Sequence, residues 1–339
     1  MLVYVVRRLL LAVPLLIAVS FLVFVIVSSF PGDPCREQLG QHPTPEAMQA
    51  CRQSLNLDGP FLERYVRYLE RAVHLDFGHN IRTEEPVRDE ILKKLPATVE
   101  LSLVALLLAF TIGTWVGMRS AMRPGTWIDV VGQILTLGGI SIPVFWLGMM
   151  LISLFGVKLG WLPFSGWTPS EVGPDLDYRT DFLLLEPLFR LRFDVFLSAL
   201  RHIALPAIAL CTIPLATITR MTRSSFLEEL GKDYVTTARA KGLPERRVVG
   251  RHVKRNALIP VITITGLQLG TLLSGAVLTE TVFSWPGLGT YLVRGADETN
   301  YPVVMGCMLL FVTTFVIVNL IVDVLYHWVD PRIRAEGAR

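Results

Sequence analysis

Six nearly uncharged apolar runs dominate this chain, and they constrain its fold more than any other feature. A bilayer-spanning helix needs about 20 apolar residues. In order, the runs are Leu9–Phe30, Leu101–Met118, Val130–Val157, Ile203–Thr219, Ala257–Thr279 and Val303–Val322. Gly138, Gly139 and Pro143 interrupt the third and longest run, which predicts a broken span there. Because 52% of the residues are hydrophobic and only 18% are charged, we expect an all-α polytopic membrane protein with six transmembrane helices.

Basic residues are unevenly distributed between the two sides that these runs separate. If both termini face the cytoplasm, the short basic segments all lie on that side: they carry Arg7 and Arg8, Arg119 and Arg123, ten cations between Arg220 and Arg255, and Arg332, Arg334 and Arg339. The loop between the fifth and sixth runs has a single cation, Arg294. The positive-inside rule therefore predicts an N-in, C-in topology.

This topology divides the chain into four parts. We expect an N-terminus with the first transmembrane helix in 1–30, an external segment in 31–97, a transmembrane core in 98–328 and a cytoplasmic tail in 329–339. The core includes an external loop, 158–201, and a cytoplasmic loop, 220–256. The first run has 22 residues and no small-x-small cleavage site follows it, so we expect a retained span rather than a cleaved secretory signal.

The four cysteines fall into two classes. Cys211 and Cys307 lie inside apolar runs and are expected to pack as small apolar side chains. Cys35 and Cys51 lie in the external segment, where disulfides persist if the compartment is oxidising. A bridge between them would close a loop of about 15 residues and stabilise it by roughly 3 kcal/mol in the chain-entropy model. The alternative is two free thiols, and the sequence leaves both open.

Common catalytic and ligand-binding motifs do not occur in the sequence. It contains no G-x-x-x-x-G-K-[ST] phosphate loop, no H-E-x-x-H, no C-x-x-C and no G-x-S-x-G. The six histidines do not occur at metal-ligand spacing. We therefore expect no catalytic residue, no metal site and no cofactor site in this chain.

Polar residues in the fifth run recur at helical spacing. Polar residues inside spans are costly and usually mark functional positions. The candidates for a polar stripe along a translocation path are Gln268, Thr271, Gly275, Thr279 and the adjacent Glu280. The alternative is helix packing, because Gly266, Gly270 and Ser274 form a row of small residues on the same helix. For Glu100 and Asp323, near the ends of the second and sixth runs, we expect a structural or snorkelling role rather than a proton relay.

The loop between the fourth and fifth runs is long, basic and patterned for helices. From Arg220 to Arg255 it carries ten Lys or Arg and four acids. Helices are expected over 225–230 and 234–240, with a break at Gly242 and a third helix from Pro244. The cations alone would suit anionic lipid. Its apolar residues favour a second interpretation, a small knob that fits a groove on another protein: Tyr234, Val235, Ala238, Ala240 and Leu243.

Several stretches of this chain resemble ABC importer permeases of the peptide-permease branch. They are Val6–Leu9, Pro31–Pro34, DYVTTARAKGLPERRV followed by RHVKRNALIPVIT in the basic loop, ETVFSWPGLGTYL with NYPVVMG within 280–306, and Val329–Arg334. Together they cover nearly the whole chain. The combination is similar to the B-type subunit of dipeptide permeases, with oligopeptide, glutathione and nickel permeases as near relatives.

The resemblance implies a type I ABC importer permease fold in the bacterial cytoplasmic (inner) membrane, with six transmembrane helices. It also implies a complex with a homologous second permease subunit, two cytoplasmic ABC ATPases and an extracytoplasmic substrate-binding protein. ATP and Mg²⁺ would be bound by the ATPases, so this chain would hold no cofactor. The expected substrates are di- and oligopeptides. Membrane lipid is a further expected partner, and nucleic acid is not expected.

The resemblance further identifies the basic loop as the segment that couples to the ATPases. The coupling residues it implies are Asp233, Tyr234, Thr237, Ala238, Arg239, Ala240, Lys241, Gly242, Leu243, Pro244 and Glu245. Ala238 and Gly242 match the alanine and glycine of the general EAA motif. Thr236 and Thr237 stand where that motif has its acid and first alanine, a variant shared by peptide-type permeases. The later I-x-L-P element is best matched by Leu258–Pro260.

Other functions remain as alternatives at this stage. Within the family, the substrate could be nickel or glutathione, since an external binding protein largely selects it. An autonomous channel or secondary transporter is disfavoured by the few charges within the runs and by the elaborate basic loop. A membrane enzyme is disfavoured because no nucleophile–base or metal constellation is present.

Overall fold

The computed structural model describes residues 2–29, 35, 39, 43–54, 58–165 and 180–329, with side chains from residue 10 onward except at 54, 135, 323 and 325–329. Every regular element in these ranges is a helix, apart from an isolated bridge between His79 and Pro86. The Pro31–Pro34 motif, most of the motif that begins at Val329, and the Asp323 side chain lie outside the described residues.

The described helices account for the six predicted spans. Five are long and apolar enough to cross a membrane: Leu10–Ser28, Val87–Met122, Phe193–Leu230, Glu245–Gly275 and Tyr301–Val322. The sixth candidate is the pair Trp127–Ser141 and Val144–Lys158, which is bent by 107° and gives six spans if it counts as one. The all-α, multi-pass architecture predicted from the apolar runs is therefore confirmed.

The chain divides into two compact units, each built from three separate stretches. The first unit comprises Met1–Glu100, Ser165–Ala199 and Ala276–Val316. Its helices are α1 (Leu2–Ser28), α3 (Pro45–Ser54), α4 (Phe61–Val73), the start of α5 (Val87–Met122), α9 (Leu185–Phe189), the start of α10 (Phe193–Leu230), α14 (Val277–Val282), α15 (Leu288–Asp297) and the first part of α16 (Tyr301–Val329).

The second unit comprises Leu101–Phe164, Leu200–Gly275 and Ile317–Arg339. It contains the remaining parts of α5, α10 and α16, together with α6 (Trp127–Ser141), α7 (Val144–Leu151), the π-helix η1 (Ile152–Lys158), α11 (Asp233–Ala240), α12 (Glu245–Arg247), the π-helix η2 (Val248–Val253) and α13 (Lys254–Gly275).

The break in the third span lies at Pro143 and not at the two glycines. Helix α6 continues through Gly138 and Gly139 to Ser141, and Pro143 then precedes the first residue of α7. Proline favours an extended conformation in the residue before it, and Ile142 has φ −92° and ψ 123°. Gly139 instead serves close packing, because a Cβ there would lie 2.8 Å from the Thr212 carbonyl oxygen of α10.

Two helices extend well beyond their apolar runs. Helix α5 begins at Val87, 14 residues before the second apolar run, and passes through Pro96. Helix α10 continues to Leu230, so the separate helix expected over 225–230 is its last part. No glycine or proline lies between Thr219 and Gly231 to end it earlier. Gly117 of α5 allows close contact with α10, since a Cβ there would lie 2.6 Å from the Thr219 carbonyl oxygen.

The first unit is held together by buried hydrogen bonds between distant segments. The Trp285 indole donates to the carbonyl oxygen of Ala97 (2.9 Å), and the backbone N–H of Leu288 donates to the Thr98 hydroxyl (2.8 Å). Gly289 lets the chain turn close to α14, because a Cβ there would lie 2.5 Å from the Cα of Val277. The segment after α14 is therefore fixed to α5 by backbone and side-chain contacts.

Glu100 has the structural role that its place near the end of an apolar run predicts. Its side chain is buried, and its two carboxyl oxygens accept hydrogen bonds from the backbone N–H groups of Leu183, Leu184 and Leu185, at 2.7 to 3.1 Å. These N–H groups lie at the beginning of α9, where no intrahelical acceptor is available. Glu100 thereby attaches the segment before α9 to α5.

Replacing Glu100 with glutamine is expected to destabilise the protein by about 2 kcal/mol, because a neutral amide oxygen accepts weaker hydrogen bonds than a carboxylate. The measurement is the free energy of unfolding in mixed detergent micelles. Glu70→Ala provides the control, since Glu70 is exposed on α4 and its side chain makes no hydrogen bond within the described residues. Equal stability of the Glu100→Gln variant and the wild type would contradict the structural role.

Candidate functional site

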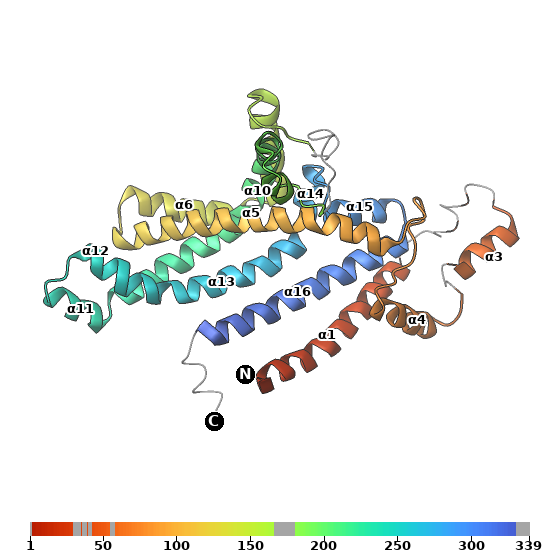
Figure 1. Ribbon diagram of the computed structural model, residues 1–339, viewed down its shortest axis with the longest axis horizontal. Coiled ribbons are helices and arrows are strands. Elements are labelled where there is room, and N and C mark those ends of the chain that lie inside the picture. Colours follow the sequence, from red (N-terminus) through yellow and green to blue (C-terminus); the bar gives the residue numbers. More distant parts are fainter. Residues whose placement is uncertain are drawn as a thin grey trace. The chain divides into compact units, whose positions relative to one another are not determined.

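The central part of the basic loop folds into a short helix with a defined end. Helix α11 (Asp233–Ala240) lies beside α12 at one end of α13 (Figure 1). After Ala240 the backbone N–H of Gly242 donates to the Arg239 carbonyl (2.9 Å), and that of Leu243 donates to the Ala238 carbonyl (3.3 Å). This is the hydrogen-bond pattern of a Schellman motif. It requires a left-handed residue after the helix, and Gly242 has φ +75°.

One face of α11 packs into the core of its own unit. Val235 and Ala238 belong to a cluster of buried residues that also contains Ala121, Phe226, Val248, Val249, Val253 and Ala257. Leu230, Tyr234 and Leu243 pack against the same cluster. The predicted apolar knob is therefore wrong for Val235 and Ala238, because their side chains are only 0% and 8% exposed. Their apolar surface anchors α11 to α5, α10 and η2 instead.

Polar contacts fix both ends of α11. Glu229, near the end of α10, bonds to both Lys232 and the Tyr234 hydroxyl, and the Asn256 amide donates to the same hydroxyl (3.3 Å). Burial and the Glu229 carboxylate raise the pKa of Tyr234, so its hydroxyl stays protonated and remains a donor. At the other end, Arg239 pairs with Glu245 at 2.7 Å. These contacts tie α11 to α10, α12 and α13.

The opposite face of α11 and the turn that follows are exposed and carry small or polar side chains. The exposed residues are Asp233, Thr236, Thr237, Arg239, Ala240, Lys241, Gly242, Pro244 and Glu245. Among the described residues, no atom lies within 4 Å of the position that a Cβ would take at Gly242. One face of α11 is thus anchored in its own unit, and the opposite face is open.

A buried ion pair joins α10 to α6 in the same unit. Arg223 of α10 contacts both carboxyl oxygens of Asp129 in α6, at 2.8 and 3.2 Å. Asp129 also accepts hydrogen bonds from the Ser120 hydroxyl, the Gly125 backbone and the Gln133 amide. The carboxylate therefore connects α5, the turn after it, α6 and α10.

The structure divides the candidate path residues between the two units. In α13 the Thr271 hydroxyl donates to the Gln268 carbonyl oxygen (2.8 Å), and an added Cβ at Gly275 would meet no atom within 4 Å. Thr279 and Glu280 belong to α14 in the first unit and are buried, with Glu280 accepting a hydrogen bond from the backbone N–H of Gly289. The five residues thus do not form one continuous helix stripe, and their part in a path stays a prediction.

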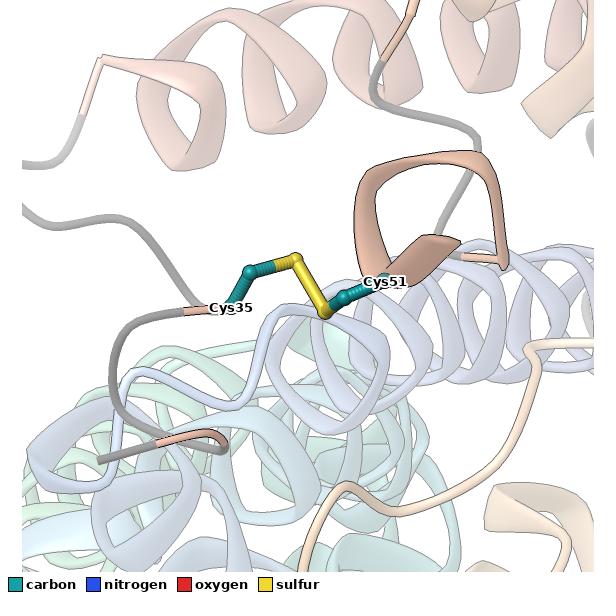
Figure 2. Close-up of a disulfide and its surroundings, with 2 residues drawn as sticks. All are labelled: Cys35 and Cys51. Carbon is teal, nitrogen blue, oxygen red and sulfur yellow. A yellow bond between two sulfur atoms is a disulfide. The ribbon is translucent and has the colours of Figure 1, made fainter. Parts of the chain in front are cut away.

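Cys35 and Cys51 form a disulfide in the external segment (Figure 2). Their Cα atoms lie 5.8 Å apart, and both residues are buried. The bridge joins the segment after α1 to α3. Cys211 and Cys307 are free and buried, as their positions in apolar runs predict.

The bridge has a simple mass signature. We expect alkylation of the unfolded chain to add two alkyl groups without reductant and four after reduction, because the chain has four cysteines and two are bridged. Intact-mass spectrometry measures both numbers. Four alkyl groups without reductant would show two free thiols at Cys35 and Cys51.

The sequence analysis did not predict that Asp129, Glu229 and Asn256 contribute to this region. Asp129 and Arg223 are 94 positions apart, and Tyr234 and Asn256 are 22 apart, so spacing along one helix does not reveal them. The available signal was a charged residue at the edge of an apolar run, which normally requires a partner.

Comparisons with known proteins agree with this architecture. Residues 109–335 match the family model described as "Binding-protein-dependent transport system inner membrane component", and residues 1–102 match the model for the N-terminal part of such membrane components. The di/tripeptide transport system permease protein DppB of Pseudomonas aeruginosa is 45% identical over 99% of this chain and 100% of its own length. The dipeptide permease protein DppB of Escherichia coli K12 is 44% identical (98% of this chain, 99% of its own), and the glutathione permease protein GsiC of an E. coli strain is 39% identical (98% and 99%).

Proposed function

Because this chain belongs to the family of binding-protein-dependent transport system inner membrane components, we propose that it is one permease subunit of an ATP-driven importer of di- and tripeptides. The chain is a multi-pass protein of the cytoplasmic membrane. The names of its 41–45% identical relatives support dipeptide transport as the function.

The complete importer would contain a second, homologous permease, two cytoplasmic ATPases and an extracytoplasmic binding protein. ATP and Mg²⁺ would be bound by the ATPases, since the sequence of this chain has no phosphate-binding loop. The permease would contribute half of the translocation path. The family supports the binding protein as a partner, because its members are described as dependent on a binding protein.

The observation that carries the coupling role is the anchored helix α11. Its buried face contacts the core formed by α5, α10 and η2, and its polar ends are bonded to Glu229, Asn256 and Glu245. Movement of an ATPase bound to the exposed face would therefore displace α10 and α13 rather than deform the loop. Because these helices continue into the membrane, such a displacement would open or close the path.

Uptake in a strain that lacks the chromosomal copy tests the proposal. Labelled di- and tripeptides are expected to accumulate when the chain is expressed with its partners and not when it is absent. Glutathione serves as the competing substrate, because a 39% identical relative is a glutathione permease protein. Uptake of glutathione but not of dipeptides would change the assigned substrate to glutathione. Uptake of peptides by the purified chain alone would contradict the dependence on ATPases.

A further inference from the structure

A cavity lies in the first unit where α1 and α16 reach the external side. Its volume is about 470 Å³, within the range of small-molecule sites. Phe24 and Val27 of α1 and Met305 of α16 supply apolar walls, and α4 and the loop 76–84 supply the rest. Helix α4 packs against the second half of α1 (Figure 1). In the N-in topology these ends of the two spans face the external side, so we expect the cavity to lie near the lipid headgroups.

Three arginines of α4 line this cavity from one side of the helix. Arg64, Arg67 and Arg71 recur at i, i+3 and i+7 spacing and therefore share a face. Arg71 is neutralised by Asp76 at 2.9 Å. Arg67 has only a neutral acceptor, the carbonyl oxygen of Asp58 (2.8 Å). Two cationic side chains of this face, Arg64 and Arg67, thus have no carboxylate partner among the described residues.

One donor of each of these two arginines is buried. The Nε atoms of both Arg64 and Arg67 are inaccessible and have no hydrogen-bond partner among the described residues. Arg64 lies with its guanidinium carbon 5.8 Å from the centre of the Phe24 ring. A buried N–H without an acceptor is unfavourable by the desolvation free energy of the group, and more so when the group is charged. An oxyanion in the cavity would give the charged guanidinium groups an anionic partner through their terminal nitrogens, since guanidinium groups suit phosphate geometry.

The other two faces of α4 are an exposed apolar face and a face buried against α1. Its apolar residues Leu62, Val66 and Val73 are 66%, 55% and 74% exposed, and by helical geometry they lie opposite the arginine face. A third face is buried against α1, where the Tyr65 hydroxyl bonds to Ser20 and to the Ile17 carbonyl oxygen. A helix with an exposed apolar stripe and a cationic face has the pattern of an interfacial helix.

We propose that this cavity binds the phosphate headgroup of an anionic phospholipid from the external leaflet. Arg64 and Arg67 donate to the phosphate oxygens, and the glycerol and first acyl carbons contact Phe24 and Val27. The lipid is favoured over a free anion because the walls are apolar on the side of α1 and because the site is at headgroup level. The bound lipid fixes α4 to the external ends of α1 and α16.

Lipid titration of the purified full-length chain tests the proposal. Native mass spectrometry in neutral detergent measures binding of phosphatidylglycerol to the wild type and to Arg64→Gln/Arg67→Gln. We expect the double variant to bind at least about tenfold more weakly, because two cations at the headgroup are lost. Arg88→Gln is the matched control: Arg88 is an exposed arginine of the same external segment and does not line the cavity. It is expected to bind lipid like the wild type.

The competing occupants give different results. Glycerol 3-phosphate that binds as tightly as phosphatidylglycerol, or a dipeptide that displaces the lipid, would overturn the lipid assignment. So would equal lipid binding by the double variant and the wild type. A parallel variant, Arg64→Lys/Arg67→Lys, keeps the charges and is expected to lose less binding than the glutamine pair. Thermal unfolding without added lipid verifies that each variant is folded, so a loss of lipid binding reports on the site.

Discussion

Replacing Gly242 with phenylalanine is expected to abolish ATP-driven uptake while the chain still inserts and folds. Gly242 is exposed, and a Cβ there would meet no atom of the described residues within 4 Å, so we expect the chain itself to accept the ring. A partner seated on α11 does not, because the ring would project from the turn that closes the helix. We expect the uptake rate to fall at least about tenfold, which corresponds to a loss of ~1.4 kcal/mol in the free energy that couples the ATPase to the permease.

Backbone strain is the competing explanation for such a loss. Gly242 has φ +75°, and a left-handed conformation costs a residue with a Cβ roughly 1–2 kcal/mol. Gly125→Phe is the matched control, since Gly125 has φ +77°, has open space at its Cβ and lies in the turn between α5 and α6. Gly242→Asn provides a second control, because asparagine tolerates this conformation. Normal uptake by Gly242→Phe, or equal loss in Gly125→Phe, would remove the coupling role.

Breaking the Asp129–Arg223 pair is expected to give the largest loss of stability. Only 4% of the Asp129 side chain is exposed, so Arg223→Met leaves a buried carboxylate without its cation. Removing one partner of a buried pair typically costs about 3–5 kcal/mol. Because 32% of the Arg223 side chain is exposed, we expect the lower end, about 3 kcal/mol. Unfolding in mixed micelles measures this difference.

Two further variants separate the pair from general effects of the substitution. Arg220→Met makes the same chemical change three residues earlier on α10, at an exposed arginine, and is expected to be nearly neutral. Asp129→Leu/Arg223→Met replaces both charges by apolar side chains and is expected to recover much of the lost stability. If the Arg223→Met and Arg220→Met variants are equally stable, the ion pair does not hold α5, α6 and α10 together.

The sequence predicted the spans well because membrane insertion is governed by local composition. Each apolar run corresponds to a helix in the described part of the chain, or to the bent pair for the third run. Helix ends were predicted less well. Helix α5 begins at Val87 and helix α10 ends at Leu230, so both continue beyond their apolar runs. Many of the residues there are polar, and hydropathy therefore does not indicate where the helices end. Pro143 breaks the helix of the third span because proline restricts the backbone, whereas Gly138 and Gly139 only permit a bend.

The faces of α11 could not be predicted from the sequence. An eight-residue helix with Val235, Ala238 and Ala240 shows apolar residues on more than one side, and which side is covered depends on α5, α10 and η2. The end of α11 was predictable, since Gly242 is the type of residue that a left-handed helix end requires. The bonds of Glu229 to Tyr234 and Asn256 arise from tertiary packing and have no local pattern.

Protection of a single cysteine by the ATPases tests the central claim most directly. Ala240→Cys places a thiol on the exposed face of α11, and Arg123→Cys places one in the turn between α5 and α6. The native Cys211 and Cys307 are buried and Cys35 and Cys51 are bridged, so they do not compete. The measured quantity is the rate of maleimide labelling with and without the assembled ATPases. We predict strong protection at position 240 and little at 123, whereas equal labelling rates of Ala240→Cys in both states would contradict docking on α11.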